Sequence, residues 1–90
     1  MFDLSISNQF KRDLKLARKR GLDEGMLDEV IKILIEGRSL PAKNKDHALV
    51  GDYKGCRECH ITPDWLLIYS VDKMVNLLTL VRTGSHSDLF

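Results

Sequence analysis

The sequence predicts an α+β fold: an N-terminal strand, then two antiparallel helices packed on one face of a mostly antiparallel sheet of four or five strands. Apolar residues recur at helical spacing in two consecutive segments before residue 37. Short stretches rich in β-forming residues follow after residue 47. The links between them are as short as Pro63-Asp64 and Asp72-Lys73, and links of this length join antiparallel strands.

The length and composition are those of a single globular domain. A chain of 90 residues can bury one core, so residues 1–90 are expected to form one domain. Apolar residues make up 43% and charged residues 30% of the chain, and the net charge of +1 indicates no particular partner. The N-terminus lacks the basic and then apolar pattern of a signal segment. We therefore expect a cytoplasmic protein with reduced cysteines and no membrane partner.

The first two predicted elements are a strand and a helix. Residues 2–7 alternate apolar and polar side chains, which is typical of a half-buried strand. From residue 8 the apolar period changes to that of a helix, with Asn8 as the expected N-cap and Gly21 as the expected end. Its apolar stripe comprises Phe10, Leu14 and Ala17.

A second helix is expected between Asp23, a suitable N-cap, and Gly37, a suitable end. The short break after the first helix favours an antiparallel pair. The buried stripe of the second helix is expected to contain Leu27, Val30, Ile31 and Leu34.

Four further strands and a short terminal helix complete the prediction. The strands are expected at residues 48–53, 56–62, 65–71 and 74–82. Ser85 and Asp88 have the spacing of a capping box, which predicts a short helix at the C-terminus.

The hairpin links also predict a register. The first would pair Thr62 with Trp65 and His60 with Leu67, and the second would pair Val71 with Met74 and Trp65 with Leu80. One face would then be uniformly apolar and lie under the helices: Cys59, Ile61, Leu66, Ile68, Leu77 and Val81. The other would carry His60, Thr62, Trp65, Leu67, Tyr69, Leu78, Leu80 and Arg82, with Asp64 beside its polar rim.

The motif Cys56-Arg57-Glu58-Cys59-His60 has the spacing of a c-type haem attachment site. It also contains half of a zinc site, or a thiol redox pair. On a strand, however, the two sulfurs would point to opposite faces, and no second cysteine pair is present. We therefore expect Cys59 in the core, Cys56 half-buried, and neither metal nor cofactor.

The three histidines are candidate catalytic residues. His60 and His86 are expected near Arg82 at one rim, and His47 in the loop that leads into the sheet. Histidine can take and give protons at cellular pH, and arginine can stabilise a charged phosphate. This combination suits phosphodiester cleavage, in which Trp65 would either stack on a base or belong to the core. An RNase, a phosphate-binding module and a protein-binding domain all remain open from these residues alone.

The first helix carries a basic surface that would either follow a nucleic-acid backbone or simply be solvated. Its residues are Lys11, Arg12, Lys15, Arg18 and Lys19.

Three segments resemble the YafQ branch of the RelE/ParE superfamily of bacterial toxins. They are residues 45–49, residues 55–65, and residues 82–86 together with Leu89-Phe90. They cover about half of the chain, and the predicted order of helices and strands fits the rest. The resemblance implies a RelE-like fold and a toxin of a type II toxin–antitoxin system. Such a toxin would be a ribosome-dependent, metal-independent endoribonuclease that cleaves mRNA through attack of the ribose 2′-hydroxyl.

The resemblance also implies roles for individual residues. His60 or Asp64 would be the general base, His86 the general acid and Arg82 the phosphate stabiliser, with His47 as a further catalytic position. Supporting positions would be Lys45, Arg57, Trp65 and Phe90. The basic helix would dock on ribosomal RNA.

The implied partners are a cognate antitoxin, the ribosome and mRNA, with operator DNA as a further ligand of the toxin–antitoxin complex. The alternative is a non-catalytic toxin of the ParE kind that inhibits a topoisomerase by protein contact. A zinc-binding interaction domain is a third possibility. The histidines favour catalysis, because binding alone does not require protonatable groups.

Overall fold

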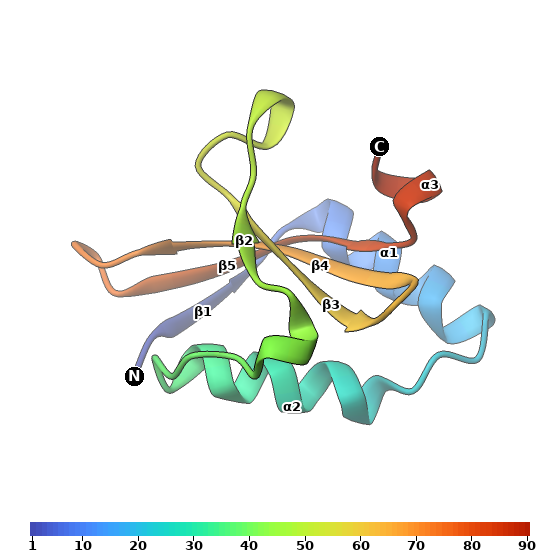
Figure 1. Cartoon of the computed structure of the whole chain (residues 1–90), viewed down its shortest axis with the longest axis horizontal. Helices are drawn as coiled ribbons and strands as arrows, with labels where there is room; N and C mark the ends of the chain where they lie inside the picture. The colour runs from blue at the N-terminus through green and yellow to red at the C-terminus, as the bar shows by residue number, and fades with distance from the viewer.

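The computed structural model describes residues 1–90 and contains a five-stranded sheet in the order β1-β5-β4-β3-β2 (Figure 1). The α+β class is confirmed. The elements are β1 (Asp3–Ile6), α1 (Asn8–Lys19), α2 (Glu24–Ile35), β2 (His47–Ala48), β3 (Arg57–Thr62), β4 (Trp65–Asp72), β5 (Leu77–Gly84) and α3 (His86–Leu89). Two 3-10 turns, η1 (Ala42–Asn44) and η2 (Gly51–Tyr53), flank β2.

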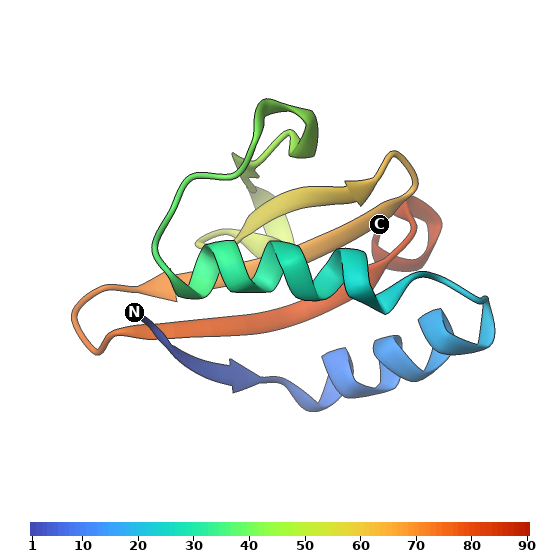
Figure 2. The same ribbon diagram turned by 90° about the horizontal axis from the view of Figure 1, so that it is seen from below.

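Strands β2 to β5 form the predicted antiparallel meander, but β1 pairs with β5 in parallel. The helices α1 and α2 run in opposite directions, as predicted (Figure 2). Helix α1 packs against β5 and α2 against β3, and both contribute to one core. No helix of the protein is long and apolar enough to cross a lipid bilayer.

The ends of the first two helices follow the expected chemistry with one correction. Ser7, not Asn8, caps α1: its hydroxyl accepts from Phe10 N at 2.9 Å and donates to Val81 O at 2.7 Å. A residue that bonds both the helix and β5 is a better cap here than its neighbour, which lies inside the first turn. Asp23 caps α2 as predicted, because its carboxylate accepts from Gly25 N at 2.9 Å.

The prediction of a strand at residues 48–53 is wrong. Only His47 and Ala48 pair with β3, and residues 51–53 form the turn η2. The chain turns away from the sheet at Gly51, whose φ of +71° is readily adopted only by glycine. This detour brings Tyr53 onto the sheet face opposite α2.

The β4–β5 hairpin is also longer than predicted. Asp72 pairs with Leu77, so residues 73–76 form the loop and Val71 pairs with Leu78 rather than Met74. The Asp72 carboxylate accepts from Met74 N at 2.9 Å and stabilises the turn.

Two bulges displace the predicted register. Thr62 pairs with Trp65 as expected, but His60 pairs with Leu66, because β3 has an irregularity between His60 and Thr62. A second irregularity lies between Ile68 and Tyr69 on β4, where Val81 is the unpaired residue of β5. Trp65 therefore does not pair with Leu80.

The prediction of which face lies under the helices was correct for Cys59 and Ile61 and wrong for most other positions. The core shared with α1 and α2 also contains five residues assigned to the opposite face: Trp65, Leu67, Tyr69, Leu78 and Leu80. Conversely, Leu66, Ile68 and Val81 lie on the far face, covered by α3 and η2. Alternation gave no warning, because β4 is apolar on both of its faces.

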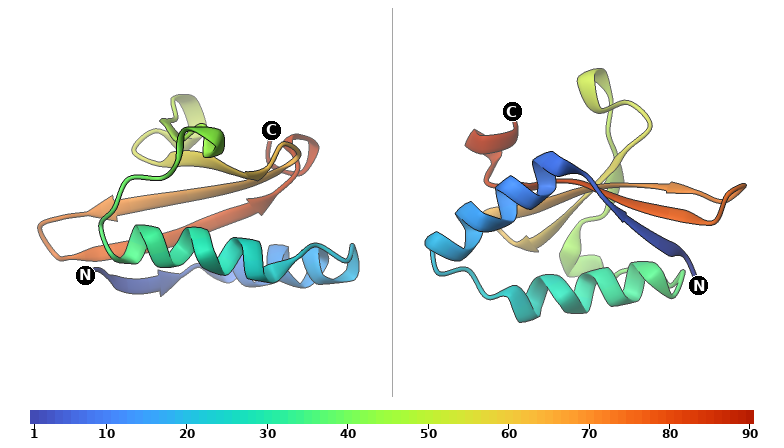
Figure 3. Two further views of the ribbon diagram at one scale, coloured as in Figure 1. Left: turned by 60° about the horizontal axis from the view of Figure 1, so that its bottom comes forward. Right: turned by 180° about the vertical axis from the view of Figure 1, so that it is seen from behind.

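The remaining features of the far face agree with the sequence. Cys56 lies there half-buried, whereas Cys59 is fully buried on the helix face, as expected. Helix α3 begins with the predicted capping box of Ser85 and Asp88. Figures 1 and 3 show α3 on the opposite side of the sheet from α2. The protein therefore has a large core under α1 and α2 and a small one under α3.

Candidate active site

Two histidines from distant parts of the chain meet on the far face. His60 extends from β3 and His86 from α3, and their ring centroids are 5.9 Å apart. His60 lies on this face because the strand alternates around the buried Cys59, and His86 because the capping box starts α3 there. The pair is the centre of the candidate site.

Aromatic rings extend the site along α3. Phe90 lies 6.1 Å from the His86 ring, and Tyr53 meets Phe90 edge-on at 5.6 Å. Tyr53 also donates a hydrogen bond to Leu89 O at 3.3 Å. Phe90 is 63% exposed, so its ring is available to stack on a base. The sequence did not single out Tyr53, because η2 was taken for a strand.

A buried carboxylate lies between His47 and His60. Glu58 Oε1 is 3.6 Å from His47 Nε2 and 3.7 Å from His60 Nε2, and only 4% of its side chain is exposed. The pairing of β2 with β3 places His47 opposite Glu58, and His60 follows two residues later on the same face. Such a carboxylate can stabilise an imidazolium that forms when a histidine takes a proton. Strand alternation puts Glu58 on the His60 face, but nothing in the sequence indicates that its side chain is buried.

The orientation of His47 is fixed from its other side. Its Nδ1 lies 2.8 Å from Lys45 O, and a carbonyl can only accept, so Nδ1 carries the proton and Nε2 faces Glu58. Lys45 itself has a left-handed backbone with φ of 49°. Its side chain and His60 line a cavity of about 330 Å³ beside η1. Lys45 thus adds a positive charge near the histidines.

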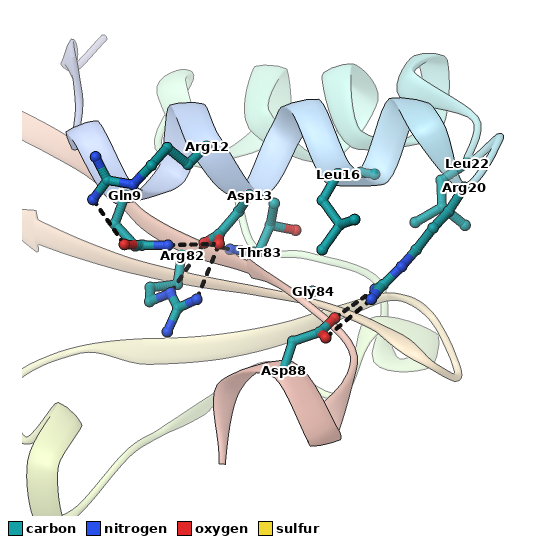
Figure 4. A pocket seen from close by; sticks show the side chains of 11 residues that line it. Gln9, Arg12, Asp13, Leu16, Arg20, Leu22, Arg82, Thr83, Gly84 and Asp88 are labelled. Atoms are coloured by element: carbon teal, nitrogen blue, oxygen red, sulfur yellow. Dashed lines mark hydrogen bonds and ion pairs between the residues drawn. The ribbon is translucent and has the colours of Figure 1, made fainter.

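Arg82 is held by Asp13 of α1. Its Nε and Nη2 each donate to the Asp13 carboxylate at 3.0 Å (Figure 4). The hydrogen bond to Asp13, with a smaller contribution from Tyr53, raises the pKa of Arg82. Burial opposes ionisation of Asp13, but hydrogen bonds from Arg82, Gln9 and Thr83 outweigh it and lower its pKa. Arg82 is therefore permanently charged, and its fork keeps further donors for a phosphate.

Three predicted site residues lie elsewhere. Trp65 is 1% exposed, so of the two roles that the sequence left open for it, the structure supports the place in the core and not stacking on a base. Arg57 points to the helix face, where it donates to Asp46 at 3.2 Å. Asp64 is exposed in the turn after β3, and no hydrogen bond or ion pair joins it to a histidine. Its charge contributes only to raising the pKa of Arg20, whose main partner is Asp88.

The basic surface of α1 is exposed along its whole length. Two of the predicted docking residues have local partners: Arg18 donates to Glu24, and Arg12 donates to Gln9 at 2.8 Å. The three others form no ion pair and present free ammonium groups: Lys11, Lys15 and Lys19.

The cysteines have no geometry for a shared ligand, because they lie on opposite faces of the sheet. Burial raises the pKa of the Cys59 thiol to about 12, which disfavours the thiolate that metal binding or redox exchange requires. No three His, Cys, Asp or Glu side chains are grouped to hold a metal ion.

Comparison with known proteins shows the family of the chain. A family model described as "Bacterial toxin of type II toxin-antitoxin system, YafQ" matches residues 2–90. The mRNA interferase toxin YafQ of Escherichia coli K12 is 46% identical over 90 residues, covering 98% of this chain and 95% of that protein.

Solved structures show the same fold. YafQ in the E. coli DinJ–YafQ complex gives a TM-score of 0.92 at 43% identity, covering 100% of this chain and 99% of that chain. A metal-bound toxin from Helicobacter pylori gives a TM-score of 0.93 at 46% identity, covering 100% of both chains. The fold and the resemblance in sequence are thereby confirmed, and the chain belongs to the YafQ family of bacterial type II toxins.

Proposed function

We propose that this toxin is an endoribonuclease that cleaves mRNA on the ribosome. The observation that carries the proposal is the pair of histidines, His60 and His86, whose ring centroids lie 5.9 Å apart on the far face of the sheet. Two imidazoles at this separation can both reach oxygens of one phosphodiester, one as base and one as acid. The name of the E. coli relative, an mRNA interferase, supports the same activity.

In the proposed reaction, His60 takes the proton of the ribose 2′-hydroxyl, and the 2′-oxygen attacks the adjacent phosphorus. The P–O5′ bond breaks as His86 protonates the 5′-oxygen, which leaves a 2′,3′-cyclic phosphate and a 5′-hydroxyl. The sequence left His60 and Asp64 open as the base. Only His60 contacts both His86 and the Glu58 carboxylate, which would stabilise its imidazolium.

The remaining residues of the site would bind and stabilise the substrate. Arg82 would stabilise the charge that develops on the phosphorane, and Lys45 would neutralise a neighbouring phosphate. Phe90 would stack on a base next to the scissile bond. His47 would act through Glu58, to which its Nε2 is turned.

We propose that cleavage is independent of metal, because proton transfer and charge stabilisation are both supplied by side chains. A metal-bound relative makes this a point to test. The rate of cleavage is expected to be unchanged by EDTA, or by added zinc or copper at stoichiometric concentration.

The proposed partners follow from the same role. The toxin would act in the cytoplasm as one domain of residues 1–90 and dock on ribosomal RNA through α1. A cognate antitoxin would neutralise it, as the DinJ–YafQ complex suggests, and the complex of the two would bind operator DNA.

The proposal is tested by cleavage of ribosome-bound mRNA with His60→Ala and His86→Ala variants. Loss of a general acid or base is expected to slow cleavage by about 10²–10⁴-fold. Thermal unfolding should be nearly unchanged, and Lys73→Ala, an exposed residue of the β4–β5 loop, serves as the control. Cleavage by His86→Ala at the parental rate would contradict the proposal. Growth arrest that survives loss of both histidines would instead indicate inhibition by protein contact.

A further inference from the structure

Helix α3 carries His86 and is followed at once by Phe90, yet it contains only four residues. A helix of one turn is not stable by itself, because nucleation costs more than its few hydrogen bonds return. The position of His86 therefore depends on what fastens α3 to the rest of the protein.

An ion pair with the end of α1 holds α3 in place. Arg20 Nη1 donates to Asp88 Oδ2 at 2.6 Å, and Nη2 donates to Oδ1 at 3.1 Å, which makes a bidentate pair (Figure 4). Asp88 Oδ2 also accepts from Ser85 N at 2.9 Å. One carboxylate thus joins the first turn of α3 to α1. The bond from Arg20 holds the pKa of Asp88 well below its usual range.

The Asp88 side chain lies directly against Gly84 of β5. A Cβ atom at Gly84 would lie 2.9 Å from both Cβ and Oδ2 of Asp88, so no larger residue fits there without moving the carboxylate. At the other end of α3, Leu89 is buried in the far-face core and Tyr53 bonds its carbonyl. Because contacts hold both ends of α3, the helix can shift relative to His60 only if the Arg20–Asp88 pair or the contacts of Leu89 break.

We propose that Arg20 is a positioning residue for His86, which acts through Asp88 to hold α3 at the separation from His60 that proton transfer requires. The consequence for catalysis rests on the proposed function. The role differs from the one expected for the basic helix, because the Arg20 guanidinium is occupied by a carboxylate instead of facing an RNA phosphate.

The catalytic test is a double-mutant cycle with Arg20→Ala, Asp88→Asn and the double variant, measured by steady-state cleavage of ribosome-bound mRNA. We expect kcat to fall by about 10- to 100-fold in Arg20→Ala, as for other small misplacements of a catalytic group, with KM within about twofold of the parent. The double variant should be no slower than the slower single variant. The kcat of Arg20→Lys should lie between those of the parent and Arg20→Ala, since an ammonium keeps the charge but cannot make the bidentate pair.

The matched control is Arg38→Ala, which removes a guanidinium from another exposed ion pair, with Glu36 at 2.9 Å, far along the chain from α3. Its kcat should equal that of the parent. If Arg20→Ala instead raises KM, and does so equally in the Asp88→Asn background, Arg20 contacts RNA and the proposal is overturned. An unchanged kcat in Arg20→Ala overturns it as well.

A second measurement does not depend on activity. Amide exchange at Leu89 and Phe90, whose N–H groups bond Ser85 O and His86 O, should accelerate in Arg20→Ala, and the contact between the His60 and His86 rings should weaken in NMR spectra. If neither changes, Arg20 does not hold α3. If both change while the parent protein cleaves no RNA, the positioning role stands and the proposed function fails.

Discussion

Thr83 connects the buried Trp65 to the backbone of β4, and we predict that loss of its hydroxyl weakens the fold but spares the chemistry of the site. The Trp65 indole donates to Thr83 Oγ1 at 2.8 Å, and the hydroxyl donates onward to Leu66 O at 2.7 Å. Trp65 and Thr83 are 1% and 2% exposed, so water cannot replace these bonds. The Thr83→Val variant keeps the shape of the side chain, removes the hydroxyl and leaves both of its partners, the Trp65 indole and Leu66 O, unpaired.

The expected cost follows from those two bonds. Each of the two buried groups left unpaired costs about 1–3 kcal/mol, so the free energy of unfolding should fall by about 2–6 kcal/mol. In a domain of this size each 1 kcal/mol corresponds to about 4–8 °C, which predicts a drop in Tm of at least about 8 °C. Because small domains are stable by about 5–15 kcal/mol, a loss of about 4 kcal/mol, the middle of the range for this variant, leaves it folded at 25 °C.

Urea unfolding followed by the fluorescence of Trp65, the single tryptophan of the chain, measures this change directly. Thr83→Ser is the control: it keeps the hydroxyl, loses one methyl group and should cost only about 1 kcal/mol. Cleavage per folded molecule should match the parent in both variants. If Thr83→Val is as stable as Thr83→Ser, the hydroxyl does not hold Trp65 and the reasoning is refuted.

Other expectations concern a carboxylate, the two thiols and the basic helix. Asp13→Asn should destabilise the protein by about 1–3 kcal/mol at pH 7. Since the folded-state pKa of Asp13 is lowered, the difference from the parent should be full above about pH 4 and shrink as the pH falls further, as urea unfolding at each pH would show. In thiol titration of the native protein, Cys56 should react while the buried Cys59 reacts only after denaturation. Ribosome binding should weaken as salt rises, and each free lysine removed from α1 should reduce the slope by roughly 0.7–0.9 if it contacts a phosphate.

The sequence was sufficient for the helices and the order of the elements. The apolar stripes of α1 and α2, the cap at Asp23 and the capping box of α3 are local signals that need no knowledge of the rest of the fold. Ser7 shows where local chemistry was insufficient. Its choice over Asn8 depends on a bond to Val81, which is 74 residues away in the chain.

The assignment of residues to the two faces of the sheet was wrong for two physical reasons. One extra residue in β3 and one in β5 shift the pairing, and a shift of one residue exchanges the faces. In addition, α3 and η2 cover the side opposite the main helices, so the hydrophobic pattern of β4 gives no sign of which side is which. Trp65 was placed near the site by that error.

For the site, the resemblance indicated His60 and His86, which the structure brings together. It did not indicate their supports. Glu58, Asp13 and Arg20 act through contacts between elements far apart in sequence, and such contacts leave no periodic signal. Charged residues of this kind are usually solvated, so composition alone could not have distinguished them from the remaining surface.

The parallel pairing of β1 with β5 has a consequence for folding of the toxin during its synthesis. Strand β1 is synthesised first, but its neighbour β5 begins only at Leu77, and α3 follows β5. A nascent chain therefore has neither the partner strand of β1 nor His86 until residues 77–86 have left the ribosome.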